Sequence, residues 1–262
     1  MNEFKMPLFS ELKCEKCNSD GFIIDGNSAQ KCECRANYEK EAMSSSILSK
    51  SGLLDGNCDY DDFKKLIDFQ FTDYRGEDKN QNIRKIKKYV EEFDNPNKPF
   101  KNLHFYVWGK QGTQKSHTLR GMLARLACDK KKTVFYTFTK QLIDLIIDSE
   151  RIEDAKKKLD YIANVDCLVL DEFDSQRIAS WKSGYKENIL ITFLKERMEI
   201  ARKSTWIISN RSIEEQKESS FGELYYDLLK RETCYGQFEF IDRYFDNIGK
   251  EEIEEKLKSI WD

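Results

Sequence analysis

The sequence has no long hydrophobic run, no basic excess and few histidines. No apolar stretch approaches the roughly 18 residues that suggest a membrane span, and the N-terminus, MNEFKMPLFSELKCEKC, lacks the apolar core of a signal peptide. The formal net charge is −3, so contact with nucleic acid would have to come from a local patch. We therefore expect a cytoplasmic protein with no membrane partner.

The composition fits a protein with a substantial core. Charged residues make up 35 % of the 262 residues and hydrophobic residues 39 %, which is typical of a soluble protein with solvated helix faces. This length allows one α/β domain with an appendage, or two small domains. In the absence of an export signal, the eight cysteines are better interpreted as thiols or metal ligands than as a disulfide framework.

Four of the cysteines cluster near the N-terminus, as one Cys-x-x-Cys pair and one Cys-x-Cys pair: Cys14, Cys17, Cys32 and Cys34. Two pairs of thiolates on adjacent turns can close a tetrahedral Cys₄ zinc site, and a module this small needs such a constraint to fold. The two histidines, His104 and His117, lie far along the chain, which argues against a mixed site. Four unrelated free thiols are the alternative. A Cys₄ zinc ion would be structural, because it has no open coordination position.

A change in composition follows the cysteines. Residues 41–70 are rich in serine, glycine and acidic residues, which indicates a linker with a domain boundary near residues 50–65. We expect a zinc module over 1–50, a linker over 51–70 and a nucleotide-binding core over 71–262. The core begins with a helix that has Ile83, Ile86, Val90 and Phe93 on one face.

The stretch LHFYVWGKQGTQKSHTL predicts a phosphate-binding loop. A short run of aromatic and β-branched residues, Phe105 to Trp108, precedes the loop, and a helix with apolar Leu119, Met122 and Leu123 follows it. In such a loop, backbone N–H groups and the helix N-terminus hold a polyphosphate, the lysine neutralises its charge, and the hydroxyl binds Mg²⁺. The residues expected to hold the nucleotide are Gly109, Lys110, Gln111, Gly112, Thr113, Gln114, Lys115, Ser116 and His117.

One position departs from the motif. The residue before Lys115 should be glycine, and here it is Gln114. A side chain at that point crowds the phosphates unless the loop takes an ordinary negative φ there. A solvent-exposed turn that only resembles the motif is the alternative.

Two later strands end in polar residues. The apolar run Cys167–Leu170 leads into Asp171 and Glu172. Asp171 would orient Mg²⁺ through water, with Ser116 as the other protein ligand, and Glu172 would polarise the attacking water. The strand at 205–209 ends in Asn210, which could reach the γ-phosphate or that water. The alternatives are a surface strand that happens to end in acids and an asparagine that starts an ordinary turn.

The rest of the chain alternates helices and strands. We expect a strand at Val134–Phe138, helices at Gln141–Asp148, Arg151–Ile162 and Lys186–Lys203, a helix with Tyr225, Leu228 and Leu229, a strand at Gln237–Ile241 and a charged helix after Gly249. This order predicts an α/β fold, with a parallel sheet flanked by helices.

With these residues assembled, the sequence resembles the bacterial and phage helicase loaders of the DnaC/DnaI type, a branch of the AAA+ ATPases. The segments that carry the resemblance are VWGKQGTQKSHTLRGML, LVLDEFDSQR, FLKERMEIARKS and STWIISNRS. They place the ATPase core at roughly residues 70–245, and the cysteine-rich start resembles the DnaI side. The resemblance implies an AAA+ P-loop core without a C-terminal lid, behind a small zinc-binding module.

The resemblance also implies further site residues. A neighbouring subunit would supply an arginine from the segment YYDLLKRET, with Arg231 the first choice and Arg243 the second; an exposed surface charge is the alternative for either. A segment after the acids would contact single-stranded DNA through Arg177, Trp181, Lys182, Tyr185 and Lys186. A loop whose Trp181 packs on the core is the alternative for that segment.

These features predict an ATPase with weak turnover, using ATP, Mg²⁺ and Zn²⁺, that loads a hexameric DnaB-type replicative helicase onto single-stranded DNA. The zinc module would dock on the helicase and the core would self-associate, whether the gene is chromosomal or phage-encoded. One alternative is a transposition-helper ATPase of the IstB type, although such proteins usually lack the cysteine-rich module. The other is a non-hydrolysing adaptor in which Gln114 has ended nucleotide use.

Overall fold

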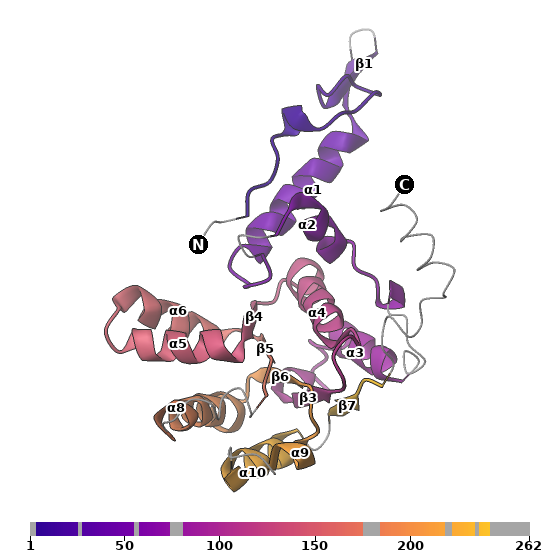
Figure 1. Ribbon diagram of the computed structural model, residues 1–262. Coiled ribbons are helices and arrows are strands. Elements are labelled where there is room, and N and C mark those ends of the chain that lie inside the picture. Colours follow the sequence, from indigo (N-terminus) through magenta and orange to yellow (C-terminus); the bar gives the residue numbers. More distant parts are fainter. Residues whose placement is uncertain are drawn as a thin grey trace, which may run out of the picture.

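A five-stranded parallel sheet forms the centre of the molecule (Figure 1). The computed structural model describes residues 4–25, 28–54, 58–73, 81–174, 184–217, 222–233 and 236–241. The strands lie in the order β4-β5-β6-β3-β7 and all pair in parallel. Their bounds are β3 His104–Trp108, β4 Val134–Phe138, β5 Cys167–Asp171, β6 Ser204–Ser209 and β7 Gln237–Glu239. Parallel pairing brings the carboxyl ends of all five strands to one edge of the sheet, where the polar residues predicted from the sequence lie.

Helices cover both faces of the sheet, because alternate residues of each buried strand point to opposite sides. On one face Phe105 and Val107 pack with helices α3 and α4, and on the other Tyr106 and Leu168 pack with α5, α8 and α10. The core helices are α3 Asn82–Glu91, α4 Lys115–Lys130, α5 Thr139–Ser149, α6 Glu153–Asn164, α8 Gly184–Lys195, α9 Ile213–Lys217 and α10 Gly222–Glu232. One wider π-helical turn, Glu196–Ile200, continues α8, so the predicted helix over 186–203 is divided.

The N-terminal part forms an arm that projects from the core (Figure 1). An antiparallel hairpin of β1 (Phe22–Asp25) and β2 (Ser28–Lys31) lies at its tip, and the long helix α1 (Glu33–Leu48) runs back to the core. A shorter helix, α2 (Tyr60–Ile67), packs with α1 against α4. The arm therefore rests on the helix that follows the predicted phosphate-binding loop.

The expectation of a linker over 51–70 is wrong for the described part of that segment. Asp59 caps α2 by accepting a hydrogen bond from the Asp62 N–H at 2.7 Å. Leu53 and Phe63 are fully buried in the core cluster that contains α4. The composition of this segment is dominated by serine and acidic residues, so its few apolar residues give no clear helical pattern. Helix α2 is short and only one of its faces is buried.

The other predicted elements are found close to their expected bounds. The strand at Val134–Phe138 has the predicted bounds, the helix expected at 151–162 begins and ends two residues later, and the strand expected at 237–241 is shorter. The expected helix after Gly249 lies outside the described residues. Among the residues that are described, no helix is long and apolar enough to cross a membrane.

Candidate functional site

The predicted phosphate-binding loop joins the end of β3 to the start of α4. Gly109 opens the loop with φ +146°, and a Cβ atom there would lie 2.1 Å from the carbonyl oxygen of Phe240. Phe240 approaches this closely because its N–H donates to the carbonyl of Trp108 at 2.8 Å. Only glycine fits at this position. Gly112, further along the loop, also has a positive φ, +86°.

Gln114 occupies the left-handed region of backbone conformation, with φ +61° and ψ +16°. The ordinary negative φ that would have relieved crowding is therefore not found. Its carbonyl already accepts the first helical hydrogen bond, from the Thr118 N–H at 2.9 Å. Gln114 thus adopts the conformation that glycine would take most easily, and its half-buried side chain lines the pocket beside the loop.

Lys115 is 6 % exposed and folds over the loop. Its Nζ donates to the carbonyls of Gly109 at 2.6 Å and Lys110 at 2.8 Å, and more weakly to Asn210 Oδ1 at 3.4 Å. Burial lowers the pKa of Lys115 to about 8, although the negative charge of Asp171 opposes the shift. The ammonium lies at the centre of the site and is short of anionic partners, which favours an anionic ligand.

The two acids lie at the end of β5. Asp171 is 4 % exposed, and its Oδ1 accepts the Glu172 N–H at 2.6 Å. Glu172 is exposed and has a positive φ, +53°, so the backbone leaves the strand conformation at this residue. A buried oriented acid next to an exposed acid suits the two predicted roles, one toward a cation and one toward a water molecule.

A pocket of about 450 Å³ brings these residues together. The phosphate-binding loop, the end of β5 and Asn210 after β6 all line it, because the carboxyl ends of neighbouring parallel strands meet there. Its predicted lining residues are Gln111, Gly112, Thr113, Gln114, Lys115, Ser116, His117, Asp171, Glu172 and Asn210. The exposed ring of His117 also makes an edge-on contact with Phe69, at 5.6 Å between ring centroids.

Tyr136 and Arg120 are among the lining residues that the sequence did not indicate. The Tyr136 hydroxyl donates to Asp171 Oδ2, and the Arg120 guanidinium lies over the Tyr136 ring at 5.4 Å. Strand β4 pairs with β5, so Phe138 lies opposite Asp171, and Tyr136 lies two residues earlier on the same face of β4. Only the strand order could have indicated Tyr136, because no sequence motif places β4 beside β5.

Three of the residues predicted from the resemblance to loaders are described by the structure, Arg231, Tyr185 and Lys186, and these three do not line this pocket. Arg231, in the last turn of α10, forms ion pairs with Glu199 and, at 2.9 Å, with Glu232. It lines a separate groove beside His104, at the opposite end of β3 from the loop. The Tyr185 hydroxyl, in the first turn of α8, donates to Glu150, and Lys186 follows in the same turn. Arg177, Trp181, Lys182 and Arg243 lie outside the described residues.

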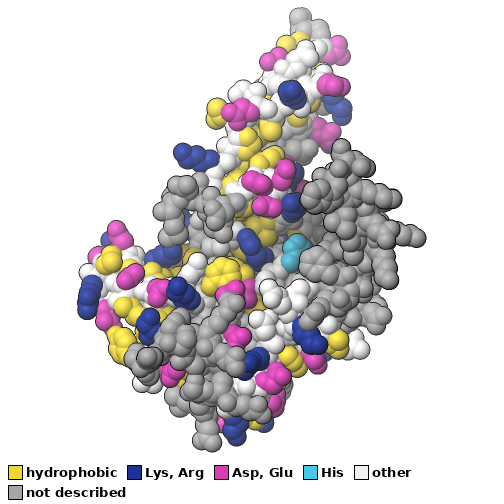
Figure 2. Space-filling view, viewed as in Figure 1, with side chains coloured by type: hydrophobic (Ala, Val, Ile, Leu, Met, Phe, Trp, Pro, Cys, Tyr) yellow, Lys and Arg dark blue, Asp and Glu magenta, His cyan; other side chains and the backbone are white. Residues whose placement is uncertain are grey.

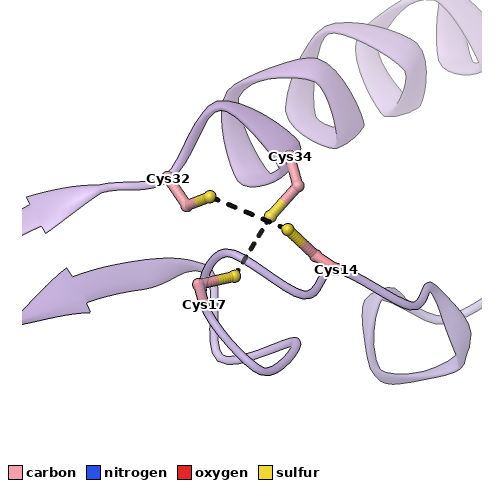
Figure 3. A group of neighbouring side chains, drawn as sticks. All are labelled: Cys14, Cys17, Cys32 and Cys34. Carbon is pink, nitrogen blue, oxygen red and sulfur yellow. Dashed lines mark hydrogen bonds between the residues drawn. The ribbon is translucent and has the colours of Figure 1, made fainter.

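The four N-terminal cysteines converge on one point (Figure 3). Their sulfur atoms all lie within 4.8 Å of one another, with Cys14 Sγ 3.9 Å from Cys32 Sγ and Cys17 Sγ 3.4 Å from Cys34 Sγ. At a Zn–S distance of about 2.3 Å, tetrahedral thiolates are about 3.8 Å apart. The spacing therefore fits a Cys₄ zinc ion. Within the described residues, no other group of histidine, cysteine and acidic side chains is placed to bind a metal.

The two halves of the cysteine cluster come from different elements. Cys14 and Cys17 lie in the loop before β1, and Cys32 and Cys34 lie at the start of α1 (Figure 3). Burial alone would raise the pKa of Cys17, but hydrogen bonds from Cys34 and from the Gly21 N–H lower it to about 7. Burial raises the pKa of Cys34. One thiol is thus easily deprotonated in this cluster, as a metal ligand must be.

Comparison with known proteins finds similarity in structure only. No family model matches the sequence, and no curated protein matches it. A DnaC helicase loader is 20 % identical with a TM-score of 0.51, over 69 % of this chain and 99 % of its own. DnaI is 18 % identical with a TM-score of 0.50, over 72 % of this chain and 93 % of its own.

DnaA from Aquifex aeolicus bound to AMPPCP is also similar, at 16 % identity and a TM-score of 0.52. The match covers 74 % of this chain but only 56 % of the DnaA chain, so this chain spans about half the length of such initiators. At these identities the likeness concerns the fold. The parallel sheet with its flanking helices is the fold that this chain has in common with these DnaC, DnaI and DnaA structures.

Proposed function

We propose that this protein is an ATP-dependent loader that delivers a hexameric replicative helicase onto single-stranded DNA. One observation carries the proposal: Lys115, Asp171, Glu172 and Asn210 line a single pocket at the carboxyl edge of an AAA+ sheet. The resemblance of the motifs to loaders, and the near-complete coverage of the DnaC chain, favour loading over other AAA+ activities.

In this proposal the loop N–H groups and Lys115 bind the phosphates of ATP. Ser116 and Asp171 hold the Mg²⁺ ion, which neutralises charge on the β- and γ-phosphates when it is bound. Glu172 is exposed and orients the attacking water, while Asn210 lies close enough to Lys115 to sense the γ-phosphate. ATP acts mainly as a switch, since it can favour only the assembly state that binds it better. Arg231 of a neighbouring copy completes the site.

A nucleotide-binding measurement tests this assignment. Lys115→Ala is expected to weaken binding of a fluorescent ATP analogue at least tenfold, because a buried charge-assisted contact is lost. Lys140→Ala is the control, since Lys140 is exposed on α5 and does not line the pocket. Equal affinity of the Lys115→Ala variant and the wild type would remove the basis of the proposal.

The zinc-binding arm is the part that we propose to dock on the helicase. The hairpin at its tip exposes three successive apolar side chains, Phe22 at 43 %, Ile23 at 41 % and Ile24 at 77 %. Hydrophobic side chains reach the surface along this arm between charged ones (Figure 2). Apolar residues gathered on a small exposed hairpin are typical of a protein-binding surface.

The docking proposal is tested with a purified DnaB-type helicase. Ile23→Ser with Ile24→Ser is expected to reduce capture of the helicase at least tenfold while zinc content and nucleotide binding stay unchanged. Ile200→Ser is the control, because Ile200 is 78 % exposed but lies outside the arm, at the end of the π-helical turn after α8. Unchanged capture by the hairpin variant would place the helicase contact elsewhere.

A non-hydrolysing adaptor is the second candidate, and Gln114 is the observation that favours it. Its side chain lines the pocket at a position where the motif has none. ATP turnover in the presence of single-stranded DNA separates the two functions. The loader predicts that Glu172→Gln abolishes a measurable turnover, whereas the adaptor predicts no difference between that variant and the wild type.

A further inference from the structure

Tyr136 lies beside Asp171, one of the two side chains that the proposed function assigns to the metal ion. It is a central residue of β4, opposite Val169 of β5. Its hydroxyl donates to Asp171 Oδ2, and its side chain lines the pocket that Ser116 also lines. The phenol therefore ties the middle of β4 to the end of β5.

The phenol completes a set of donors that fixes the Asp171 carboxylate. Oδ1 accepts the Glu172 N–H at 2.6 Å, and Oδ2 accepts the Tyr136 hydroxyl. The backbone carbonyl of Asp171 accepts the Thr139 hydroxyl at 2.8 Å. With a donor on each oxygen, the buried carboxylate cannot rotate freely. Without the phenol, only the donor on Oδ1 would remain.

The direction of this hydrogen bond follows from chemistry. A carboxylate accepts only, so Tyr136 must be the donor to Asp171. Burial and then the Asp171 charge raise the pKa of Tyr136 well above its usual range, which favours the protonated phenol as the donor.

The surroundings hold the Tyr136 ring in place. The backbone N–H of Tyr136 donates to the Ser51 carbonyl at 2.7 Å, on the outer edge of β4 where no further strand of the described residues pairs. The Arg120 guanidinium lies over the ring at 5.4 Å and donates to the Leu53 carbonyl at 2.8 Å. Backbone pairing on one side and a cation above the ring restrict its movement.

We propose that Tyr136 is a positioning residue for the metal–nucleotide complex, which holds the Asp171 carboxylate in one orientation in the pocket that Ser116 also lines. The inference rests on the proposed ATP-dependent function. Magnesium requires near-ideal octahedral geometry, so displacement of its ligands weakens binding. Loss of the phenol therefore weakens the magnesium-dependent part of nucleotide binding, while the phosphate contacts made by the loop and Lys115 remain.

The test is Tyr136→Phe, which removes one oxygen and retains the ring under Arg120. Binding of a fluorescent ATP analogue is measured in EDTA and across a Mg²⁺ titration. We expect unchanged affinity in EDTA and an about tenfold rise in the Mg²⁺ concentration at half-maximal enhancement, the usual effect of losing a hydrogen bond to a charged group. In an Asp171→Asn background the same change should add no further shift, because the phenol acts through that carboxylate.

Tyr225→Phe is the matched control. Tyr225 is equally well buried and donates to the Glu187 carbonyl at 2.6 Å, but it lies on α10 away from the pocket. It should lose a similar amount of thermal stability without any change in Mg²⁺ dependence. A wild-type Mg²⁺ midpoint in folded Tyr136→Phe would overturn the positioning role alone. A wild-type protein that binds no nucleotide would overturn the proposed function together with it.

Discussion

Gln114 and Lys115 are adjacent residues that carry different energetic costs. Gln114 has an unfavourable backbone conformation and a half-buried side chain, whereas Lys115 has ordinary helical geometry and a buried charge. Both costs arise at the N-terminus of α4, where the loop must turn sharply. Such costs persist where the surrounding structure enforces them, as it often does at binding sites.

Replacement of Gln114 by glycine tests the cost of the side chain. Gln114→Gly is expected to stabilise the protein by about 0.5–1 kcal/mol, because glycine adopts a positive φ without strain. It should also strengthen ATP binding severalfold by clearing the pocket wall. Lys131→Gly is the control, since Lys131 has a similar φ of +55° at the far end of α4. It should gain stability without any change in nucleotide affinity, as measured by urea unfolding and analogue binding.

The buried charge of Lys115 predicts a dependence of stability on pH. Its pKa is about 8 in the folded protein and near 10.5 when unfolded, so between these values the unfolded chain binds more protons. The free energy of unfolding should therefore gain a rising contribution from pH 8 to pH 10.5. Lys115→Met should lack this contribution and be more stable than the wild type at pH 7 in chemical unfolding. Parallel pH profiles for the two proteins would contradict the burial argument.

The residues of the site could be predicted where a motif fixes their spacing along the chain. Lys115 and Ser116 follow their glycines in sequence, and Asp171 and Asn210 follow strands that appear in the sequence as short apolar runs. Tyr136 could not be found in this way, because its role depends on which strand lies beside β5. The backbone conformation of Gln114 also depends on the loop as a whole and not on the residue, which on its own favours negative φ.

Among the elements, the π-helical turn after α8 is notable because it positions a buried arginine. Arg197 is 2 % exposed, and its guanidinium donates to the carbonyls of Ala163 at 2.7 Å, Val165 at 2.9 Å and Ser204 at 2.9 Å. These carbonyls lie at the end of α6 and beside the starts of β5 and β6. One side chain thus satisfies backbone carbonyls at the end of α6 and at the amino ends of β5 and β6.

Loss of this arginine should destabilise the fold. Arg197→Met is expected to cost about 3 kcal/mol or more, because several buried carbonyls lose their donor. Arg197→Lys should recover only part of the loss, since an ammonium cannot reproduce the planar arrangement of donors. Arg202→Met, at an exposed position nearby, should change stability little. Thermal and urea unfolding check all three.

The elements themselves could be predicted to different degrees. Strands of the parallel sheet are buried on both faces and therefore appear as continuous apolar runs, such as Val134–Phe138, whose bounds agree. Helix α2 was not predicted, because its polar residues dominate the composition and Phe63 is its one buried residue. Its packing on α4 is a tertiary contact that a local pattern cannot show.

At the scale of the whole molecule, the arm and the core are stabilised in different ways. The core has two apolar clusters, one on each face of the sheet. Every residue of the two strands β1 and β2 is exposed, so the fold of the hairpin depends on the cysteine cluster that ties it to α1. Loss of the metal should therefore unfold the hairpin and leave the core folded.

Removal of the metal tests this separation. Cys32→Ser is expected to reduce bound zinc from about one equivalent to near zero and to abolish protection of the hairpin amides from hydrogen exchange. Nucleotide binding should persist, because the pocket shares no residue with the cluster. Cys128→Ser is the control, as Cys128 lies on α4 outside the cluster. Less than about half an equivalent of zinc in the wild-type protein would count against the Cys₄ site.

Helix α4 is covered on more than one side, and this has a consequence for any attempt to divide the chain. The sheet covers one side of it, while Leu48, Leu53 and Phe63 cover another and Phe69 lies directly against Gly121. A fragment that begins at residue 71 would expose this apolar surface to water. We expect such a fragment to aggregate in light-scattering measurements, whereas one that begins near the start of α1 should remain monodisperse. The solubility of the core thus depends in part on residues that precede it in the sequence.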